Sequence, residues 1–175
     1  MFSFFRMKGL KRVLPVCLAL GLLVLAGCPG GGGDNDINIP GALPTGLVGK
    51  WEEPTYNDFF QITGSPETLA YDANYGGLGD YVGNIEFVSN YNSSAGVIII
   101  KYTSGAPDGT KLYHAIYYLD FKPGISVSLN NTWDATDPLY NADTATLQEA
   151  IEKFTKGKMG NWMDPSSAPT YNKTS

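Results

Sequence analysis

The chain has 175 residues, and beyond residue 27 it carries eight lysines, no arginine and 17 acidic residues, a net charge of −9. Nucleic-acid binding needs Lys and Arg to neutralise phosphates, and bidentate recognition of phosphate or carboxylate relies on guanidinium groups, so the composition argues against both. The stretch from Leu47 onward is long enough for one folded domain and too short for two.

The first 26 residues combine a basic start with a short apolar segment. Residues 1–12 carry four basic side chains and no acid, and residues 13–26 form the apolar segment. Fourteen residues span about 21 Å as a helix, which is short of the hydrocarbon core of a membrane, about 30 Å. The pattern therefore favours a cleaved secretory signal over an uncleaved membrane anchor.

The run Leu25-Ala26-Gly27-Cys28 resembles the lipobox of a bacterial lipoprotein signal peptide. The resemblance implies that residues 1–27 are removed and that the Cys28 thiol carries a diacylglyceryl group. Two or more acyl chains, such as palmitate, hold a protein almost permanently at a bilayer. We therefore expect a monomeric, lipid-anchored protein of the bacterial cell envelope, with the outer membrane or the cell surface favoured. Because its body is acidic, the lipid rather than a basic patch must hold it at the membrane.

Residues 28–46 are predicted to form a lipidated, flexible tether. Pro29–Gly33 and the following Asp34-Asn35-Asp36 show no apolar periodicity. The flanking sequence lacks the glycine and distal glutamate of the known calcium loop, so a tether is favoured over a calcium site. The folded domain is expected over residues 47–163, with a polar C-terminal tail at 164–175.

Between Val48 and Asn130, short apolar segments are separated by turn residues, which predicts about seven antiparallel strands. The predicted strands are 48–53, 59–63, 67–71, 81–89, 97–102, 112–121 and 125–130. Val97–Ile100 is apolar on both faces, so we expect it to be the most deeply buried strand. Alternation also places two sets of residues each on one face: Tyr81, Gly83, Ile85 and Phe87, and Tyr113, Ala115, Tyr117, Leu119 and Phe121.

One helix is predicted near residues 146–156. Thr146-Leu147-Gln148-Glu149 fits a capping box, and Gly157 is a suitable helix terminator. The apolar stripe that would pack on the sheet comprises Leu147, Ala150, Ile151 and Phe154.

Gly49-Lys50-Trp51, at the start of the first predicted strand, resembles the G-x-W motif of lipocalins and related calycins. The resemblance implies an up-and-down barrel followed by a helix, with the tryptophan across the closed end and an apolar ligand at the open mouth. Two features depart from the family pattern: about seven strands are predicted where eight are expected, and no arginine is present to cap the tryptophan.

Residues 95–154 have a strand-rich middle, an Asn131-Thr132-Trp133-Asp134 turn and a Thr146-Leu147-x-Glu149-Ala150 helix. With these features the region also resembles uncharacterised lipoproteins from spirochaetes, a resemblance that implies no activity. The expected fold class is mainly β: an antiparallel up-and-down, calycin-like barrel or a small sandwich, with one C-terminal α-helix.

The sequence shows no assembled catalytic group, so we expect neither an enzyme nor a cofactor or metal. His114 is the single histidine, Cys17 lies in the signal, and Cys28 is used by the lipid. A histidine alone forms no zinc cluster, and no nucleophile elbow is present. Asp134, Asp137 and Asp143 surround Trp133, a grouping compatible with calcium ligands, a carboxylate pair or helix caps.

The leading hypothesis is a protein that binds an apolar small molecule in a lipocalin-like pocket lined by aromatic side chains. The candidate ligand-binding residues are Trp51, Tyr81, Phe87, Tyr113, Tyr117 and Trp133. The alternative is a surface interaction module with a solid core, whose Gly- and Asn-rich loops at 74–79 and 90–94 bind protein or glycan. The size of the interior separates the two hypotheses.

Overall fold

The computed structural model describes residues 39–73, 80–137 and 142–175. The predicted signal peptide, Cys28, the tether up to residue 38 and the loop at 74–79 lie outside the described residues. The described residues all belong to one unit, which comprises residues 33–175.

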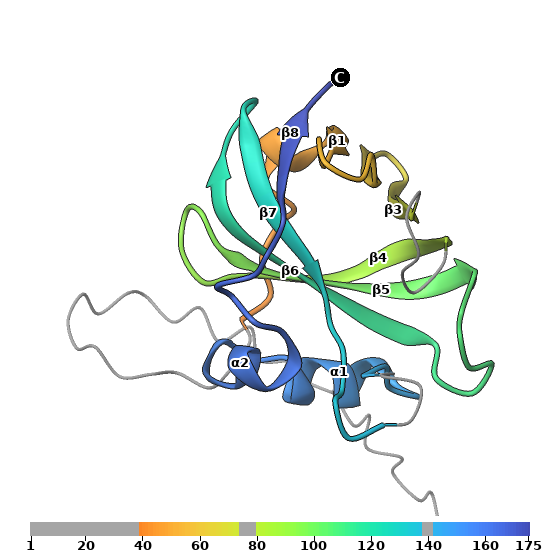
Figure 1. Cartoon of the computed structure of the whole chain (residues 1–175). Helices are drawn as coiled ribbons and strands as arrows, with labels where there is room; N and C mark the ends of the chain where they lie inside the picture. The colour runs from red at the N-terminus through yellow and green to blue at the C-terminus, as the bar shows by residue number, and fades with distance from the viewer. Residues whose placement is uncertain (1–38, 74–79, 138–141) are drawn as a thin grey trace, which may run out of the picture. The chain divides into compact units, whose positions relative to one another are not determined.

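Eight antiparallel strands form a closed barrel in which each strand pairs with its neighbours in sequence (Figure 1). The strands are β1 (Gly49–Glu52), β2 (Phe59–Gly64), β3 (Glu67–Asp72), β4 (Tyr81–Asn90), β5 (Gly96–Ser104), β6 (Tyr113–Lys122), β7 (Ser126–Asn131) and β8 (Thr170–Lys173). The barrel closes because β8 pairs with both β7 and β1. The predicted up-and-down barrel is therefore confirmed, and the sandwich alternative is wrong.

The first seven strands lie within two residues of the predicted positions, but the eighth lies in the segment predicted as a polar tail. That prediction is wrong. Of the four residues of β8, only Tyr171 is buried. A strand with one inward-facing apolar residue has no period-2 pattern, and Pro169 directly before it suggests a loop. The strand forms because the barrel needs a partner for the free edges of β1 and β7.

One cluster of buried hydrophobic side chains fills the barrel. Its members come from all eight strands and from the 3-10 turn η1 (Thr45–Leu47): Leu47, Trp51, Phe60, Ile62, Leu69, Tyr71, Tyr81, Val88, Ile98, Ile100, Tyr102, Ile116, Tyr118, Phe121, Val127, Leu129 and Tyr171. The Trp51 indole is fully buried and donates from Nε1 to the Leu47 carbonyl oxygen at 2.8 Å.

A lysine lies on the Trp51 ring, where the lipocalin pattern prefers an arginine. Lys173 Nζ is 5.5 Å from the ring centroid and donates to the Val48 carbonyl oxygen at 2.8 Å. Lys173, on β8, therefore contacts both Trp51 on β1 and Val48 directly before β1, at the point where the barrel closes.

A second buried cluster lies outside the barrel, beneath the helix α1 (Leu147–Lys153). The capping box at Thr146 and Glu149 forms as predicted, although the helix ends at Lys153 and not at Gly157. After it come η2 (Lys156–Lys158) and the short α2 (Met159–Trp162). No helix within the described ranges has the length and apolar character needed to cross a membrane.

The helix-side cluster explains why β5 is apolar on both faces. Val97 and Ile99 pack beneath the helical segment, whereas Ile98 and Ile100 point into the barrel. All four side chains are fully buried, so the prediction of a strand buried on both faces is confirmed.

Two β-bulges reverse the alternation that the sequence predicts. In β4 the register shifts between Ile85 and Phe87, so Phe87 packs with the helix-side cluster while Val88 enters the barrel. In β6 it shifts between Leu119 and Lys122, and Phe121 enters the barrel. The predictions that Phe87 shares a face with Tyr81, and Phe121 with Tyr113, are therefore wrong. An extra residue in one strand moves every later side chain to the other face.

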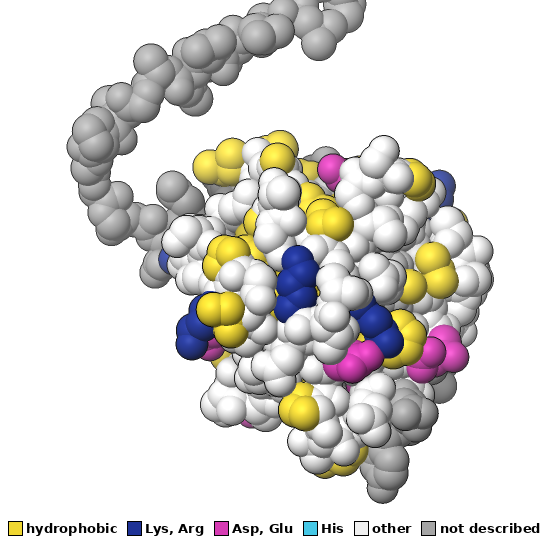
Figure 2. All heavy atoms as spheres, turned by 90° about the horizontal axis from the view of Figure 1, so that it is seen from above, with side chains coloured by type: hydrophobic (Ala, Val, Ile, Leu, Met, Phe, Trp, Pro, Cys, Tyr) yellow, Lys and Arg dark blue, Asp and Glu magenta, His cyan; other side chains and the backbone are white. Residues whose placement is uncertain are grey.

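The face seen from above in Figure 2 shows no single large hydrophobic area. Hydrophobic side chains occur there in small groups, with lysine and acidic side chains between and around them. Scattered surface hydrophobic side chains of this kind are common on folded domains.

Replacing Tyr171 tests whether β8 is part of the core. Tyr171→Ala removes a ring that is 3% exposed and packs 5.1 Å from the Phe60 ring centroid, so we expect the free energy of unfolding to fall by about 3–5 kcal/mol. The exposed neighbour on the same strand, Asn172→Ala, should change it by about 0.5 kcal/mol or less. Urea unfolding measures both. Equal effects of the two changes would show that β8 is dispensable.

Candidate functional site

The structure does not bring the six predicted ligand-binding residues together. Trp51 and Tyr81 point into the barrel, whereas Phe87, Tyr113 and Tyr117 lie in the helix-side cluster on the opposite face of the sheet. Trp133 follows β7 and is 38% exposed. The six side chains therefore belong to three separate environments.

Aromatic rings occupy the interior where the lipocalin resemblance places a ligand. Phe60 and Tyr71 have ring centroids 4.7 Å apart, and Tyr71 and Tyr81 are 5.4 Å apart. The series continues from Tyr81 to Tyr102 at 5.6 Å and from Tyr102 to His114 at 5.7 Å. An eight-stranded barrel is just wide enough for side chains to fill or for one small ligand. Here large, buried side chains of the described residues occupy the inward positions.

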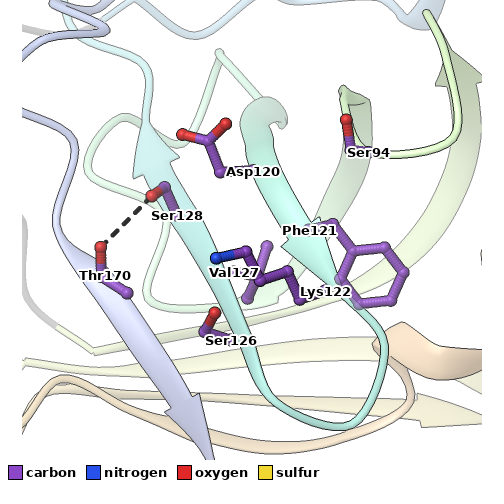
Figure 3. A pocket seen from close by; sticks show the side chains of 8 residues that line it. All are labelled: Ser94, Asp120, Phe121, Lys122, Ser126, Val127, Ser128 and Thr170. Carbon is purple, nitrogen blue, oxygen red and sulfur yellow. Dashed lines mark hydrogen bonds between the residues drawn. The ribbon is translucent and has the colours of Figure 1, made fainter.

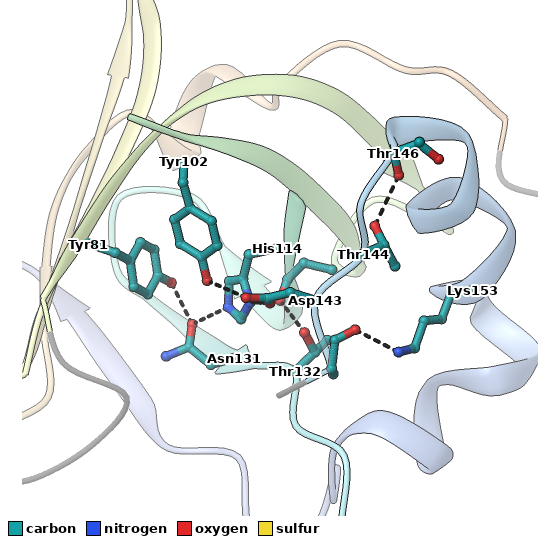
Figure 4. Close-up of polar contacts among 11 residues, drawn as sticks. Tyr81, Tyr102, His114, Asn131, Thr132, Asp143, Thr144, Thr146 and Lys153 are labelled. Atoms are coloured by element: carbon teal, nitrogen blue, oxygen red, sulfur yellow. Dashed lines mark hydrogen bonds and ion pairs between the residues drawn. The ribbon is translucent and has the colours of Figure 1, made fainter. Parts of the chain in front are cut away.

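Buried polar groups close the end of the barrel where β1, β3, β5 and β7 finish, called the mouth below (Figure 4). His114 Nδ1 lies 2.6 Å from Asp143 Oδ1, and Tyr102 donates to Asp143 Oδ2 at 3.1 Å. His114 Nε2 lies 3.1 Å from Asn131 Oδ1, which also accepts from the Tyr81 hydroxyl at 2.5 Å. Since these groups bind one another, the network joins the segment before α1 to the barrel wall.

Burial raises the pKa of the phenols that fill the barrel or lie beneath the helix. Desolvation is the largest cause in each case, and the Asp143 charge adds to it at Tyr102. The pKa of Tyr118 rises to about 12, and that of Tyr81 lies well above its usual range. The other tyrosines with a raised pKa are Tyr71, Tyr91, Tyr117 and Tyr171.

A groove of about 420 Å³ lies on the wall of the barrel across β6, β7 and β8, called the wall groove below (Figure 3). Four hydroxyl side chains line it: Ser94, Ser126, Ser128 and Thr170. Asp120 and Lys122 add one carboxylate and one ammonium group. Within the described ranges, neither charged group has a hydrogen bond or ion pair with another side chain.

The bulge in β6 gives the wall groove its carboxylate. Asp120 has φ 50°, in the left-handed region, and the two residues Asp120 and Phe121 stand opposite the single Val127. Strict alternation from Tyr118 would point Asp120 into the apolar barrel, whereas the structure leaves Asp120 exposed and buries Phe121. Sequence reasoning missed this site. The available signal was a carboxylate at an inward position of a predicted strand, which favours a bulge.

A larger depression, about 640 Å³, lies between the β5–β6 loop and α1, but its charged side chains already have partners. Lys111 pairs with Asp137 at 3.3 Å, and Lys153 donates to the Ala142 carbonyl oxygen at 2.6 Å. Asp143 contacts His114, and Glu149 completes the capping box. The wall groove is therefore the better candidate, because its charges are not used by the fold.

The aspartates around Trp133 do not converge on one point. Asp134 accepts from the Thr136 backbone N–H and hydroxyl at 2.9 and 2.6 Å, whereas Asp137 and Asp143 have the partners given above. Over the described residues, no group of three or more His, Cys, Asp or Glu side chains is placed to hold a metal ion.

Comparison with known proteins adds no family or relative: no family model, curated protein or solved structure matches the chain. The barrel is compatible with the lipocalin-like architecture that the Gly49-Lys50-Trp51 motif suggests. Function must therefore be argued from the side chains themselves.

The raised phenol pKa values predict a loss of stability in alkali. Unfolded tyrosine ionises near pH 10, whereas the buried phenols stay protonated at higher pH. Below about pH 10 both states hold the proton and stability is unaffected. As the pH rises from 10 towards 12 and beyond, the unfolded state loses protons first and the free energy of unfolding falls. Tyrosinate absorbance of the folded protein measures phenol ionisation, and urea unfolding at each pH measures the free energy of unfolding. Complete phenol ionisation near pH 10 in the folded protein would contradict it.

Proposed function

We propose that this protein is a lipid-anchored module of the bacterial cell envelope, and that its solid barrel presents a binding groove on its outer wall. The observation that carries the proposal is the contrast between the two candidate places for a ligand. Rings of the protein occupy the inward positions, whereas the wall groove holds two charged side chains, Asp120 and Lys122, that have no side-chain partner in the described part of the chain.

The filled interior favours this proposal over a lipocalin-like pocket for an apolar ligand. A ligand inside the barrel would have to displace fully buried side chains such as Phe60 and Ile98. Exposing or displacing each such side chain costs about 1.5–3 kcal/mol. An apolar ligand would therefore have to replace contacts that the protein already makes with itself.

The anchor is supported by Leu25-Ala26-Gly27-Cys28 and by the acidic body that follows. An acidic surface is repelled by anionic lipids, so a covalent lipid is the attachment that suits this composition. In this arrangement the barrel is held near the membrane while its outer wall remains open to the surrounding solution.

Replacing the lipobox cysteine tests the anchor. In cells that express the full chain, Cys28→Ser should move the protein from the membrane fraction to the soluble fraction and abolish incorporation of labelled palmitate, because the thiol is the acceptor of the lipid. Cys17→Ser is the matched control and should leave both unchanged. Equal palmitate labelling of the Cys28→Ser protein would contradict lipidation at this residue.

A binding comparison tests the wall groove against an apolar pocket. We expect saturation-transfer NMR to detect binding of at least one of two polar probes, dialanine and sucrose, and no binding of a fluorescent fatty acid. Lys122→Ala should weaken polar-probe binding by about tenfold, because hydrogen bonds to charged groups contribute about 1.5–3 kcal/mol. Lys101→Ala, an exposed lysine on β5, should leave it unchanged.

The opposite result would favour the calycin-like hypothesis. Fatty-acid binding that quenches tryptophan fluorescence, together with no effect of Lys122→Ala on any probe, would place the ligand inside the barrel and overturn the wall-groove proposal.

A further inference from the structure

The wall groove carries one charge of each sign, and this narrows the class of its ligand. We infer that it binds a small zwitterion, a free amino acid or a short peptide with both its ammonium and its carboxylate group. The inference rests on the proposed function and adds to it the chemistry of the ligand.

The two charged side chains leave the same strand at the bulge, Asp120 from within it and Lys122 directly after it. Asp120 and Lys122 are both exposed, and Phe121 between them turns into the barrel. Lys122 stands opposite Ser126 in the β6–β7 register, and in Figure 3 its ammonium group reaches over β7, whereas the Asp120 carboxylate turns away from it, beyond Ser128. The two charges therefore lie at opposite ends of the hydroxyl-lined groove.

This arrangement matches the two ends of a zwitterion. The Asp120 carboxylate accepts from a ligand ammonium group, and the Ser128 hydroxyl offers a second acceptor there. At the other end, the Lys122 ammonium and the Ser126 hydroxyl both donate to a ligand carboxylate. Thr170 Oγ1 lies 3.5 Å from Ser128 Oγ, a contact long enough for either hydroxyl to turn to a ligand.

Other ligand classes fit less well. An inorganic anion would meet the Lys122 ammonium but also the like charge of Asp120. A neutral sugar would find hydroxyl partners but no ring to stack on, because Phe121, the one aromatic residue lining the wall groove, is 5% exposed. Its ring packs instead against Trp51 and Tyr118, with centroid distances of 6.2 and 6.3 Å.

The size of the groove suits one or two residues. Its volume of about 420 Å³ is at the lower end of the range for small-molecule sites, about 300–1,000 Å³. A dipeptide spans at most about 7 Å between its ends. We therefore take dialanine as the probe, together with two blocked forms that each lack one charge.

The experiment is an NMR titration of the full chain with dialanine, its two blocked forms N-acetyl-dialanine and dialanine amide, sucrose and inorganic phosphate. We expect dialanine to shift the backbone resonances of Ser126, Ser128 and Thr170, and each blocked form to bind about tenfold more weakly, because each loses one charged hydrogen bond. Asp120→Asn keeps a residue type that tolerates positive φ and should remove the preference for the free ammonium group. Asp120→Gly, which also suits positive φ, serves as the second variant.

The outcomes separate the inference from the proposed function. Equal binding of dialanine and both blocked forms, or binding of sucrose or phosphate alone, would overturn the zwitterion inference while leaving a wall-groove site in place. Failure of dialanine, sucrose and phosphate to shift any resonance of the wall groove would overturn both. The Asp120→Asn and Asp120→Gly variants could still prefer dialanine to N-acetyl-dialanine. That result would show that another group binds the ammonium group of the ligand, and it would also overturn the inference.

Discussion

The narrow interior of an eight-stranded barrel is the constraint on which the rest of this structure depends. Such a barrel holds either its own side chains or one small ligand. In this chain the inward positions hold large rings, including Trp51, Phe60, Tyr71, Tyr81 and Tyr102. Because these rings occupy the inward positions, we propose a ligand site on the outer wall rather than inside the barrel.

Filling the barrel with tyrosine has a second consequence, because each buried phenol needs a hydrogen-bond partner. At the mouth, Asn131 and Asp143 supply partners, and Asp143 lies in the segment that leads to α1. The polar groups that satisfy the rings therefore also fix the segment before the helix. This places α1 over β5 and β6, where it covers Val97 and Ile99.

The seven predicted strands and the capping box were accessible from the sequence because each leaves a local signal. Period-2 alternation, turn residues and the Thr146–Glu149 spacing depend on neighbours in the chain. β8 leaves no such signal, since its formation depends on the free edges of β1 and β7, which are far away in sequence. The two bulges are hidden for a related reason: alternation assumes one residue per position, and one added residue moves Phe87 and Phe121 to the other face.

The wall groove depends on the β6 bulge, which only the position of Asp120 indicates in the sequence, and its origin can be separated from its use. An unpaired carboxylate inside the barrel would cost several kcal/mol, whereas the left-handed conformation costs about 1–2 kcal/mol, less for aspartate. Folding alone therefore explains why Asp120 sits at a bulge and faces outward. It does not explain the charge, because asparagine or glycine would suit the same backbone without it. The carboxylate at this position, in the same groove as the Lys122 ammonium, is the feature that folding does not require and that the proposed ligand binding would use.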